Sequence, residues 1–340
     1  MANFRVIQED PLRYKEQILQ FWTEYLPGTP PGRFEWLQDG NPSGPALWFF
    51  ALESKTSELA GVISILPAEI IRQGKKIRAG ILGDFMVSKK YRVFGPNFLL
   101  PRAVRNNSAG LGFQLIYTIP NAESEKIARR EGFHQAGVVH TFVKPLRIAP
   151  YVNKYMHPLA ARLVSPLVDM GLRITSRELS VSSRGLFQEV SEIDGSFEHF
   201  WHAIRQNQPD MIGDHRPAYL QWKYFQNPLH TFRILTYRER ADGNLLGYLV
   251  FTMHESKMHI YDVIALHKKY ACKLLKETIK RGRKERCQSI QMQILETNPL
   301  LPVVRSFRFI NARDDVNLLF SSEEAWNFEG FSFFAGNRNL

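Results

Sequence analysis

Cysteine is scarce in this sequence, and the usual export and membrane signals are missing. Of the 340 residues only two are cysteines, Cys272 and Cys287, and they lack the C-x-x-C spacing of a metal or redox site. A disulfide scaffold is therefore excluded, and a reducing cytoplasm fits the chain best. The N-terminus has no basic stretch followed by an apolar core, so we expect no signal peptide. Two charged residues and two prolines interrupt residues 156–172, the most membrane-like stretch, so we expect no transmembrane segment.

Short motifs of several enzyme classes are also absent. The chain has no phosphate-binding P-loop and no G-x-S-x-G nucleophile elbow. Gly110-Leu-Gly112 precedes a strand pattern instead of following one, so it is no dinucleotide fingerprint. His199 and His202 share one helix face, but no third and fourth ligand is suggested. We therefore expect no metal site.

What the sequence does contain is typical of a globular protein with two cores. Its 44% apolar and 23% charged residues exclude a largely disordered chain, and its length suits two domains. The net charge of +11 is uneven, because residues 267–286 carry nine basic residues against two acidic ones. A nucleotide, an anionic sugar, a nucleic acid or an acidic lipid could be attracted there. Tyr270 is the one aromatic residue among these charges, fewer than a base-stacking surface requires, so a solvated helix face is favoured and no DNA partner is expected.

An internal repeat divides the chain. Three features recur after 186 positions: a tryptophan, an Asn-Pro pair and a glycine, at Trp36, Asn41-Pro42 and Gly61 and again at Trp222, Asn227-Pro228 and Gly247. Tryptophan is rare, so an ungapped repetition of this kind points to two related units. We predict a first domain over residues 1–146, a helical bridging segment over 147–185 and a second domain over 186–340.

The bridging segment carries an apolar helix face at Leu159, Leu163 and Leu167. It could pack between the two domains or lie on a membrane surface. Its basic residues are few, so packing between the domains is favoured and a peripheral membrane contact stays open.

The first unit alternates strand and helix patterns. The expected strands cover residues 4–8, 48–52, 60–66, 81–87, 113–119 and 138–143, and the expected helices cover 12–25, 96–107 and 122–131. Polar turns join the strands as hairpins near residues 54–58 and 73–76. This order predicts an α/β fold with a mixed sheet.

The loop between the strand ending at Val87 and the helix beginning near Pro96 is the most informative stretch. It contains Arg92-x-x-Gly95-x-Asn97. Successive backbone N–H groups at a helix N-terminus can hold a pyrophosphate, and a glycine permits close approach. The loop resembles the coenzyme A signature of the GNAT acyltransferase superfamily. The order of elements, Asn121 and Gly132-Phe133 extend the likeness to nearly the whole chain.

The resemblance implies a fold, a cofactor and a set of residues. The fold would be two tandem GNAT-like domains, each a mixed, mainly antiparallel sheet flanked by helices. Acetyl-CoA would be the default co-substrate. Backbone groups of Phe85, Met86 and Val87 would contact the pantetheine, and Asn121 would face the cofactor arm. The pyrophosphate would be surrounded by Arg92, Val93, Phe94, Gly95 and Asn97.

Departures from the superfamily pattern affect the chemistry. Asn97 stands where Gly or Ala is usual, and Pro96 removes one donor from the loop. The tyrosine that often protonates the leaving thiolate would fall near Ala128, so water or another side chain would have to serve.

Asp84 is the candidate general base, because acidic residues near the start of the fourth strand of the superfamily often draw the proton from the amine. The alternative is a structural carboxylate at the end of a strand, and Asp262 occupies the matching place in the second unit. That unit has no glycine in its loop, so we expect it to shape the acceptor site instead of binding coenzyme A.

The expected function is transfer of an acyl group from coenzyme A to an amine. The resemblance, which includes proteins of bacterial polysaccharide and cell-surface biosynthesis, suggests an amino sugar or a surface-polymer precursor, which could be anionic. Two alternatives stay open: an aminoacyl transferase that uses charged tRNA, and a non-catalytic binding or scaffold protein.

Overall fold

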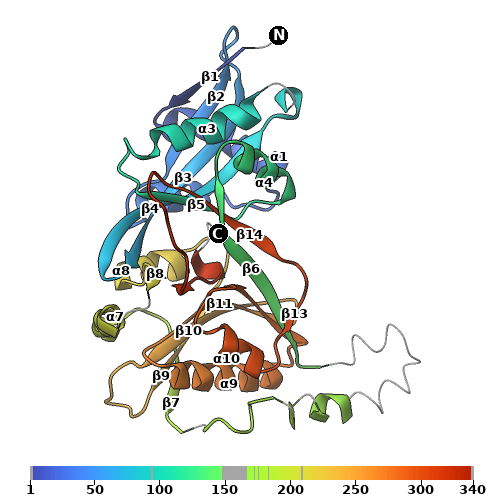
Figure 1. Cartoon of the computed structure of the whole chain (residues 1–340). Coiled ribbons are helices and arrows are strands. Elements are labelled where there is room, and N and C mark those ends of the chain that lie inside the picture. The colour runs from blue at the N-terminus through green and yellow to red at the C-terminus, as the bar shows by residue number, and fades with distance from the viewer. Residues whose placement is uncertain are drawn as a thin grey trace, which may run out of the picture.

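A computed structural model describes residues 3–92, 95–147, 167–171, 173–174, 176–182, 184–207 and 210–337. The described chain forms one mixed, mainly antiparallel sheet of 15 strands with helices on its faces (Figure 1). The predicted α/β class with a mixed sheet flanked by helices is therefore confirmed. The sheet is continuous from one half of the chain to the other, which the sequence did not indicate.

The first half follows the expected order closely. Its elements are β1 (Phe4–Gln8), the 3₁₀ turn η1 (Pro11–Tyr14), α1 (Lys15–Tyr25), α2 (Arg33–Asp39), β2 (Leu47–Glu53), β3 (Leu59–Arg72), β4 (Lys75–Val87), η2 (Lys89–Tyr91), α3 (Pro96–Ser108), β5 (Leu115–Thr118), α4 (Ala122–Arg130) and β6 (His134–Pro145). Strands β3 and β4 form a long hairpin whose turn lies at Gln73-Gly74, both with positive φ.

The second half repeats much of this order. Its elements are β7 (Leu186–Val190), α7 (Gly195–Asn207), β8 (Met211–Gly213), α8 (Pro217–Leu220), the π-helical turn η3 (Gln221–Phe225), β9 (Arg233–Arg238), β10 (Gly247–His254), β11 (Lys257–Ala265), α9 (Lys268–Lys284), β12 (Ser289–Leu295), α10 (Leu301–Ser306), β13 (Ile310–Asn311), β14 (Val316–Ser321), β15 (Phe331–Ser332) and the 3₁₀ turn η4 (Ala335–Asn337).

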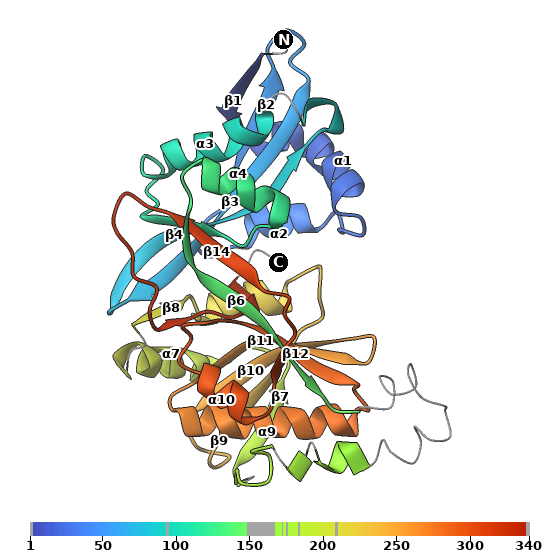
Figure 2. The same ribbon diagram turned by 45° about the vertical axis from the view of Figure 1, so that its right-hand side comes forward.

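The two halves exchange their last long strands. The sheet order is β1-β2-β3-β4-β5-β14-β6-β12-β11-β10-β9-β7, so β14 pairs with β5 and β6 pairs with β12. Strands β6 and β14 also pair with each other and cross the middle of the molecule (Figure 2). Each half therefore completes its sheet with a strand of the other half. The boundaries at residues 146 and 186 describe the sequence repeat, and they stay a prediction as domain boundaries.

Two layers of side chains enclose the sheet of the first half. On one face, α1 and α2 bury Trp22 and Phe34 against residues such as Ile81 of β4. On the other face, α3 and α4 bury Leu100 and Ala128. Adjacent strand residues alternate between these layers, as a pleated sheet requires.

The repeated tryptophans meet at the junction of the two halves. The rings of Trp36 and Trp222 stack with centroids 4.6 Å apart at an interplanar angle of 12°. The Trp36 indole N–H donates to the Trp222 carbonyl oxygen over 3.0 Å, and the Trp222 indole N–H donates to the Trp36 carbonyl oxygen over 2.9 Å. The arrangement is reciprocal, so two residues related by the sequence repeat are also related by a local twofold relation.

Basic side chains of helix α9 contact the segment that bridges the two halves. Lys273 and Lys276 donate to the carbonyls of Arg184 and Val181, and Arg283 pairs with Glu178. The described part of the bridging segment therefore lies along α9. Residues 148–166, 172, 175 and 183 of this segment are outside the described residues, and with them most of the expected packing between the domains.

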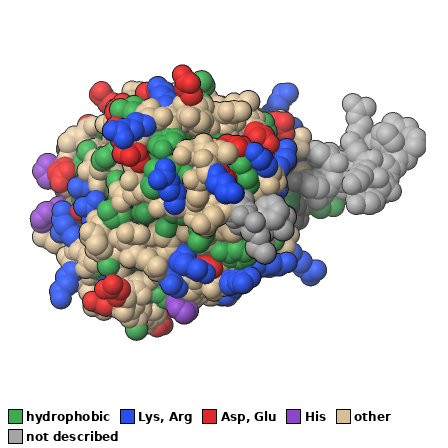
Figure 3. Space-filling model, turned by 90° about the horizontal axis from the view of Figure 1, so that it is seen from above, with side chains coloured by type: hydrophobic (Ala, Val, Ile, Leu, Met, Phe, Trp, Pro, Cys, Tyr) green, Lys and Arg blue, Asp and Glu red, His purple; other side chains and the backbone are tan. Residues whose placement is uncertain are grey.

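The charge on one face of the molecule is mixed. Seen from above, Lys and Arg side chains are scattered among acidic and apolar ones, so the positive excess is not gathered on this face (Figure 3). Within the described chain, none of the helices combines the length and the apolar character that crossing a bilayer requires.

Candidate active site

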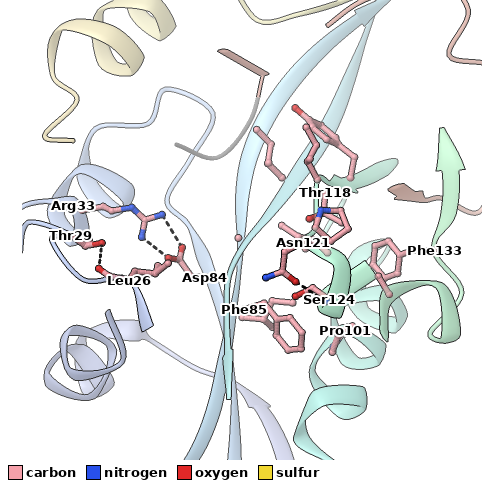
Figure 4. Close-up of a pocket in the computed structure, with 18 of the residues that line it drawn as sticks. Leu26, Thr29, Arg33, Asp84, Phe85, Pro101, Thr118, Asn121, Ser124 and Phe133 are labelled. Atoms are coloured by element: carbon pink, nitrogen blue, oxygen red, sulfur yellow. Dashed lines mark hydrogen bonds and ion pairs between the residues drawn. The ribbon is translucent and has the colours of Figure 1, made fainter. Parts of the chain in front are cut away.

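The site begins where two neighbouring strands separate. The parallel pair β4 and β5 is joined only from Ala79 to Ile81 on β4 and from Leu115 to Tyr117 on β5. Beyond Ile81, β4 continues along β3 and its other edge loses the β5 ladder. A cavity of about 470 Å³ lies at this gap (Figure 4). Backbone polar groups at an edge of this kind can pair with an extended ligand.

The cavity reaches both faces of the sheet. On the α3 and α4 face the lining side chains are Ile63, Leu82, Phe85, Pro101, Asn121, Ser124, Ala128 and Phe133. On the α1 and α2 face they are Leu26, Thr29, Arg33, Ile81, Asp84, Tyr117 and Ile119, with Leu229 from the second half. One face of the cavity is thus mostly apolar, whereas the other carries an ion pair.

A β-bulge shapes β4 at the cavity. Ser64 pairs with Gly83 and Val62 pairs with Met86, so Asp84 and Phe85 together lie opposite Ile63. Asp84 has a φ of 49°, in the left-handed region that non-glycine residues seldom occupy. Bulges of this kind redirect side chains and backbone groups at functional sites. Here the bulge sends Asp84 towards α1 and α2 (Figure 4).

The carboxylate of Asp84 is buried and held by three side chains. The Arg33 guanidinium forms an ion pair with it at 2.5 Å, and the side chains of Asp84 and Arg33 are only 0% and 6% exposed. The Trp22 indole and the Ser64 hydroxyl each donate to it at 2.9 Å. A base in this position would have to give up part of this network, and the role of Asp84 as base stays a prediction.

Arg33, Trp22 and Ser64 were not identified as site residues from the sequence. Each is far from Asp84 along the chain, and Arg33 is separated from it by 51 residues. The signal that could have found Arg33 is its place directly before the Phe34-Glu-Trp36 motif of the repeat, although the aligned residue of the second unit is Tyr219.

The predicted phosphate loop lies at the N-terminus of α3. Gly95 has a φ of 112° and precedes Pro96, the first residue of the helix. The Asn97 side-chain amide donates to the Arg92 carbonyl and so closes the loop. The Arg92 guanidinium lies 5.4 Å from the centroid of the Tyr25 ring. Val93 and Phe94, which were also predicted to contact the pyrophosphate, lie outside the described residues.

Asn121 stands at the start of α4 and lines the cavity. Its Oδ1 accepts from the backbone N–H of Ser124 at 2.9 Å, which caps the helix. The amide nitrogen of the same side chain points to the side of β4 (Figure 4). It is therefore placed to donate to a ligand lying along that strand. Met86 and Val87 continue β4 from Phe85 towards the loop.

At the place where the GNAT resemblance implies a tyrosine, the side chain that lines the cavity is small and apolar. Ala128 lines the cavity there, as expected from its distance before Gly132. The cavity does contain one phenol, Tyr117, whose hydroxyl donates to the Asn337 carbonyl at 2.9 Å. Burial raises the pKa of Tyr117, so this group keeps its proton at neutral pH.

Comparison with known proteins gives structural likeness only. No protein-family model matches the sequence, and no curated protein matches it. Among solved structures, a probable N-acyltransferase of unknown function from Enterococcus faecalis superposes with a TM-score of 0.69 at 14% identity, over 96% of this chain and 74% of the other. A GCN5-related N-acetyltransferase from Anabaena variabilis gives 0.65 at 12% identity, over 94% and 72%. Saccharomyces cerevisiae N-myristoyltransferase with bound myristoyl-CoA gives 0.61 at 11% identity, over 96% and 84%.

This chain has the GCN5-related N-acetyltransferase fold. The likeness covers nearly the whole of this chain and so includes both of its halves. At sequence identities of 10–14%, the comparison shows a shared fold and does not identify the substrate.

Within this fold, the matching gap of the second half is filled by the chain itself. Strands β11 and β12 pair only as far as Ile260 and Met292. Beyond that point Phe334 forms a bridge with Ile294, and Asn298 donates its side-chain amide to the Phe333 carbonyl at 3.1 Å. A Cβ added at Gly336 would lie 2.4 Å from Asp262 Oδ2, so this segment passes directly beside the carboxylate.

The second half also has no counterpart of the loop that precedes α3 in the first half. Helix α9 begins at Lys268 directly after His267, without a glycine in the left-handed conformation. Asp262 is buried and accepts a hydrogen bond from Tyr224. Burial raises the pKa of Asp262 to about 7 and lowers the pKa of the neighbouring Lys223 to about 7. Asp84 and Asp262 therefore share a strand position but have different partners.

Proposed function

We propose that this protein is an acyl-CoA-dependent N-acyltransferase whose cofactor site is the open gap between β4 and β5. One observation carries the proposal. The matching gap in the second half holds a segment of the chain itself, residues 333–337, whose first two residues are bound through backbone and amide hydrogen bonds and whose last three form the turn η4. The gap of this fold therefore accepts a narrow chain that bears amide groups, and pantetheine is such a chain.

The residues around the open gap fit this cofactor. The backbone of Phe85, Met86 and Val87 would contact pantetheine, and Asn121 would donate to it as Asn298 donates to Phe333 in the second half. The loop from Arg92 to Asn97, including Val93 and Phe94, would surround the pyrophosphate. Gly95 leaves room there, because the nearest atom to an added Cβ is 4.0 Å away.

The reaction would be direct transfer. The amine nitrogen bonds to the thioester carbonyl carbon, the carbon–sulfur bond breaks, and coenzyme A leaves as a thiolate that takes up a proton. The chain would contribute by aligning the two reactants and by offering a backbone N–H of the β4 bulge to the oxyanion. Asp84 would accept the amine proton, directly or through water, while Arg33 stays beside it.

The acceptor would approach from the α1 and α2 face. That face carries Thr29 and the Arg33–Asp84 pair and receives Leu229 from the second half. An amine on a sugar or on a cell-surface polymer precursor, handled in the cytoplasm, is the acceptor that the sequence resemblance suggests. A contribution from both halves agrees with the expectation that the second half shapes the acceptor site.

Calorimetric titration with coenzyme A and acetyl-CoA tests the proposal. Gly95→Glu places a negative charge and a side chain where the pyrophosphate would lie. Gly112→Glu is the matched control, because Gly112 also has a positive φ, of 80°, and open surroundings after the other end of α3. We expect micromolar binding by the wild type and by Gly112→Glu, and at least a 100-fold loss in Gly95→Glu.

Other outcomes select between the alternatives. No binding of either ligand by the wild type would overturn the proposal, and binding of charged tRNA in its place would favour an aminoacyl transferase. Binding of acyl-CoA without turnover on any amine would favour a scaffold. Equal binding by both glycine variants would move the cofactor away from the α3 loop.

A further inference from the structure

The cavity extends past the place where the cofactor's sulfur would lie. If pantetheine runs along Phe85 to Val87, the thioester comes near Phe85. Of the described residues, those lining the cavity run from Ile81 to Phe85 on β4 and do not include Met86, Val87 or the α3 loop. Most of the cavity therefore lies on the acyl side of the sulfur, beyond the part that pantetheine would occupy.

The space on the α3 and α4 face is apolar. Six side chains from β3, β4, α3, α4 and the turn after α4 form a hollow, namely Ile63, Leu82, Phe85, Pro101, Ala128 and Phe133. Polar side chains on this face, Asn121 and Ser124, stand together in the first turn of α4. An apolar hollow with few polar groups is suited to hydrocarbon and offers nothing to a charged or hydroxylated acceptor.

The small side chain of Ala128 keeps this hollow open. A tyrosine at this place, as the superfamily pattern often has, would project its ring towards the sheet from α4. Ala128 is 7% exposed and packs in the same apolar layer as Phe133. The loss of the tyrosine thus removes a proton donor and also leaves room for more carbon atoms.

The size of the cavity exceeds what an acetyl group requires. A methyl group is close in size to a water molecule, whose share of volume is about 30 Å³. The cavity measures about 470 Å³. Even with the acceptor amine occupying the side of Arg33 and Asp84, an acetyl methyl would leave most of the hollow without contacts, and poorly packed apolar space is unfavourable.

We propose that the preferred donor is an acyl-CoA whose hydrocarbon chain is longer than acetyl and lies in the hollow beneath α3 and α4. This inference rests on the proposed acyltransferase function. The acyl chain would leave the thioester near Phe85 and pass between Ile63 and Leu82 on the sheet and Pro101, Ala128 and Phe133 on the helix side. The amine would reach the carbonyl from the opposite face.

The test is a titration series with free coenzyme A and with acetyl-, butyryl-, hexanoyl-, decanoyl- and tetradecanoyl-CoA. For the wild type we expect affinity to rise by about fourfold for each methylene that becomes buried, until the hollow is filled. In Ala128→Leu we expect unchanged binding of coenzyme A and acetyl-CoA and loss of the gain for longer chains. Ala122→Leu is the matched control, since Ala122 lies on the same helix but is exposed and outside the cavity.

A second variant keeps the inference falsifiable if Ala128→Leu does not fold. Ile63→Ala enlarges the hollow from the sheet side and should shift the tightest binding to a longer chain. Thermal unfolding of each variant checks its folding, and Gly95→Glu should lose every ligand, which separates site binding from adsorption of long chains.

Two results would overturn the inference while leaving the proposed function intact. One is coenzyme A and acetyl-CoA binding as tightly as every longer thioester. The other is a chain-length series in well-folded Ala128→Leu and Ile63→Ala that is identical to that of the wild type. Failure of free coenzyme A itself to bind would instead overturn the proposed function, and this inference with it.

Discussion

The two halves of the molecule contain the same gap between strands and use it differently. In the first half β4 and β5 separate beside Asp84 and leave an open cavity. In the second half β11 and β12 separate in the same way, and residues 333–337 fill the space beside Asp262. The geometry of the sheet thus provides a place for a narrow chain twice, and the choice between a binding site and a packed core depends on whether a segment of the protein occupies it.

The aspartates beside the two gaps have different partners. Replacing each of them by asparagine should therefore give the largest difference in the free energy of unfolding. Asp84→Asn leaves the Arg33 guanidinium buried without its carboxylate, so we expect a loss of about 3–5 kcal/mol in the free energy of unfolding. Asp262→Asn should change it by less than about 1 kcal/mol near pH 5, because Asp262, whose pKa is raised to about 7, is already neutral there. Urea unfolding at pH 5 measures both values.

The pH dependence sharpens the same comparison. The pKa of Asp262 is about 7 in the folded protein and near 3.8 when unfolded, so the folded state holds an extra proton between these values. Stability contributed by this group is therefore lost as the pH rises from about 4 to about 7. Asp262→Asn lacks this loss and should gain stability relative to the wild type over that range. Equal effects of the two substitutions at pH 5, or no change with pH, would contradict the assignment of a neutral Asp262 in the folded protein.

Local sequence patterns predicted most elements of the first half because they depend on neighbouring residues. The strand at residues 4–8 is confirmed, and the helices at α3 and α4 agree with the predictions to within one residue at each end. The exchange of β6 and β14 carries no local signal, since a strand has the same alternation whichever neighbour it pairs with.

For the site, the sequence predicted three residues that line the cavity but not their surroundings. Asp84, Phe85 and Asn121 all line the cavity. The ion pair with Arg33 and the filling of the second gap could not be predicted, because both depend on contacts between residues far apart in the chain. The repeat was more informative about packing: the two tryptophans that revealed it stack on each other.

The segment that fills the second gap can be displaced by one methyl group. A Cβ at Gly336 would lie 2.2 Å from the Tyr224 hydroxyl and 2.4 Å from Asp262 Oδ2, so Gly336→Ala should destabilise the fold by about 1–3 kcal/mol. Gly32→Ala is the control, because Gly32 has a φ of −59° and no atom within 4 Å of an added Cβ. It should be neutral or slightly stabilising. A neutral Gly336→Ala would mean that the segment does not pack against Asp262.

The smallest difference to be measured, that between two matched substitutions, tests whether the two halves are equivalent where they meet. Each indole of the Trp36–Trp222 pair donates to the other residue's carbonyl and is buried, with exposed fractions of 6% and 1%. Trp36→Phe and Trp222→Phe each remove one of these bonds and leave a buried carbonyl without its donor, which costs about 1–3 kcal/mol beyond the loss of ring area. Trp48→Phe controls for the ring area, because Trp48 is fully buried and its indole N–H has no hydrogen-bond partner.

Subtracting the Trp48→Phe value from each of the other two removes the contribution of ring area, and it adds the same constant to both, because Trp48→Phe also removes a buried N–H that has no partner. If the local twofold relation extends to energetics, the two remainders should agree within about 0.5 kcal/mol, the usual error of such additive comparisons. The double variant should depart from the sum of the single losses by about 0.5–1.5 kcal/mol, because the stacked rings contact each other. Unequal remainders would show that the halves have diverged at their junction as well as at their gaps. The difference between the halves would then extend beyond the segment that fills the second gap.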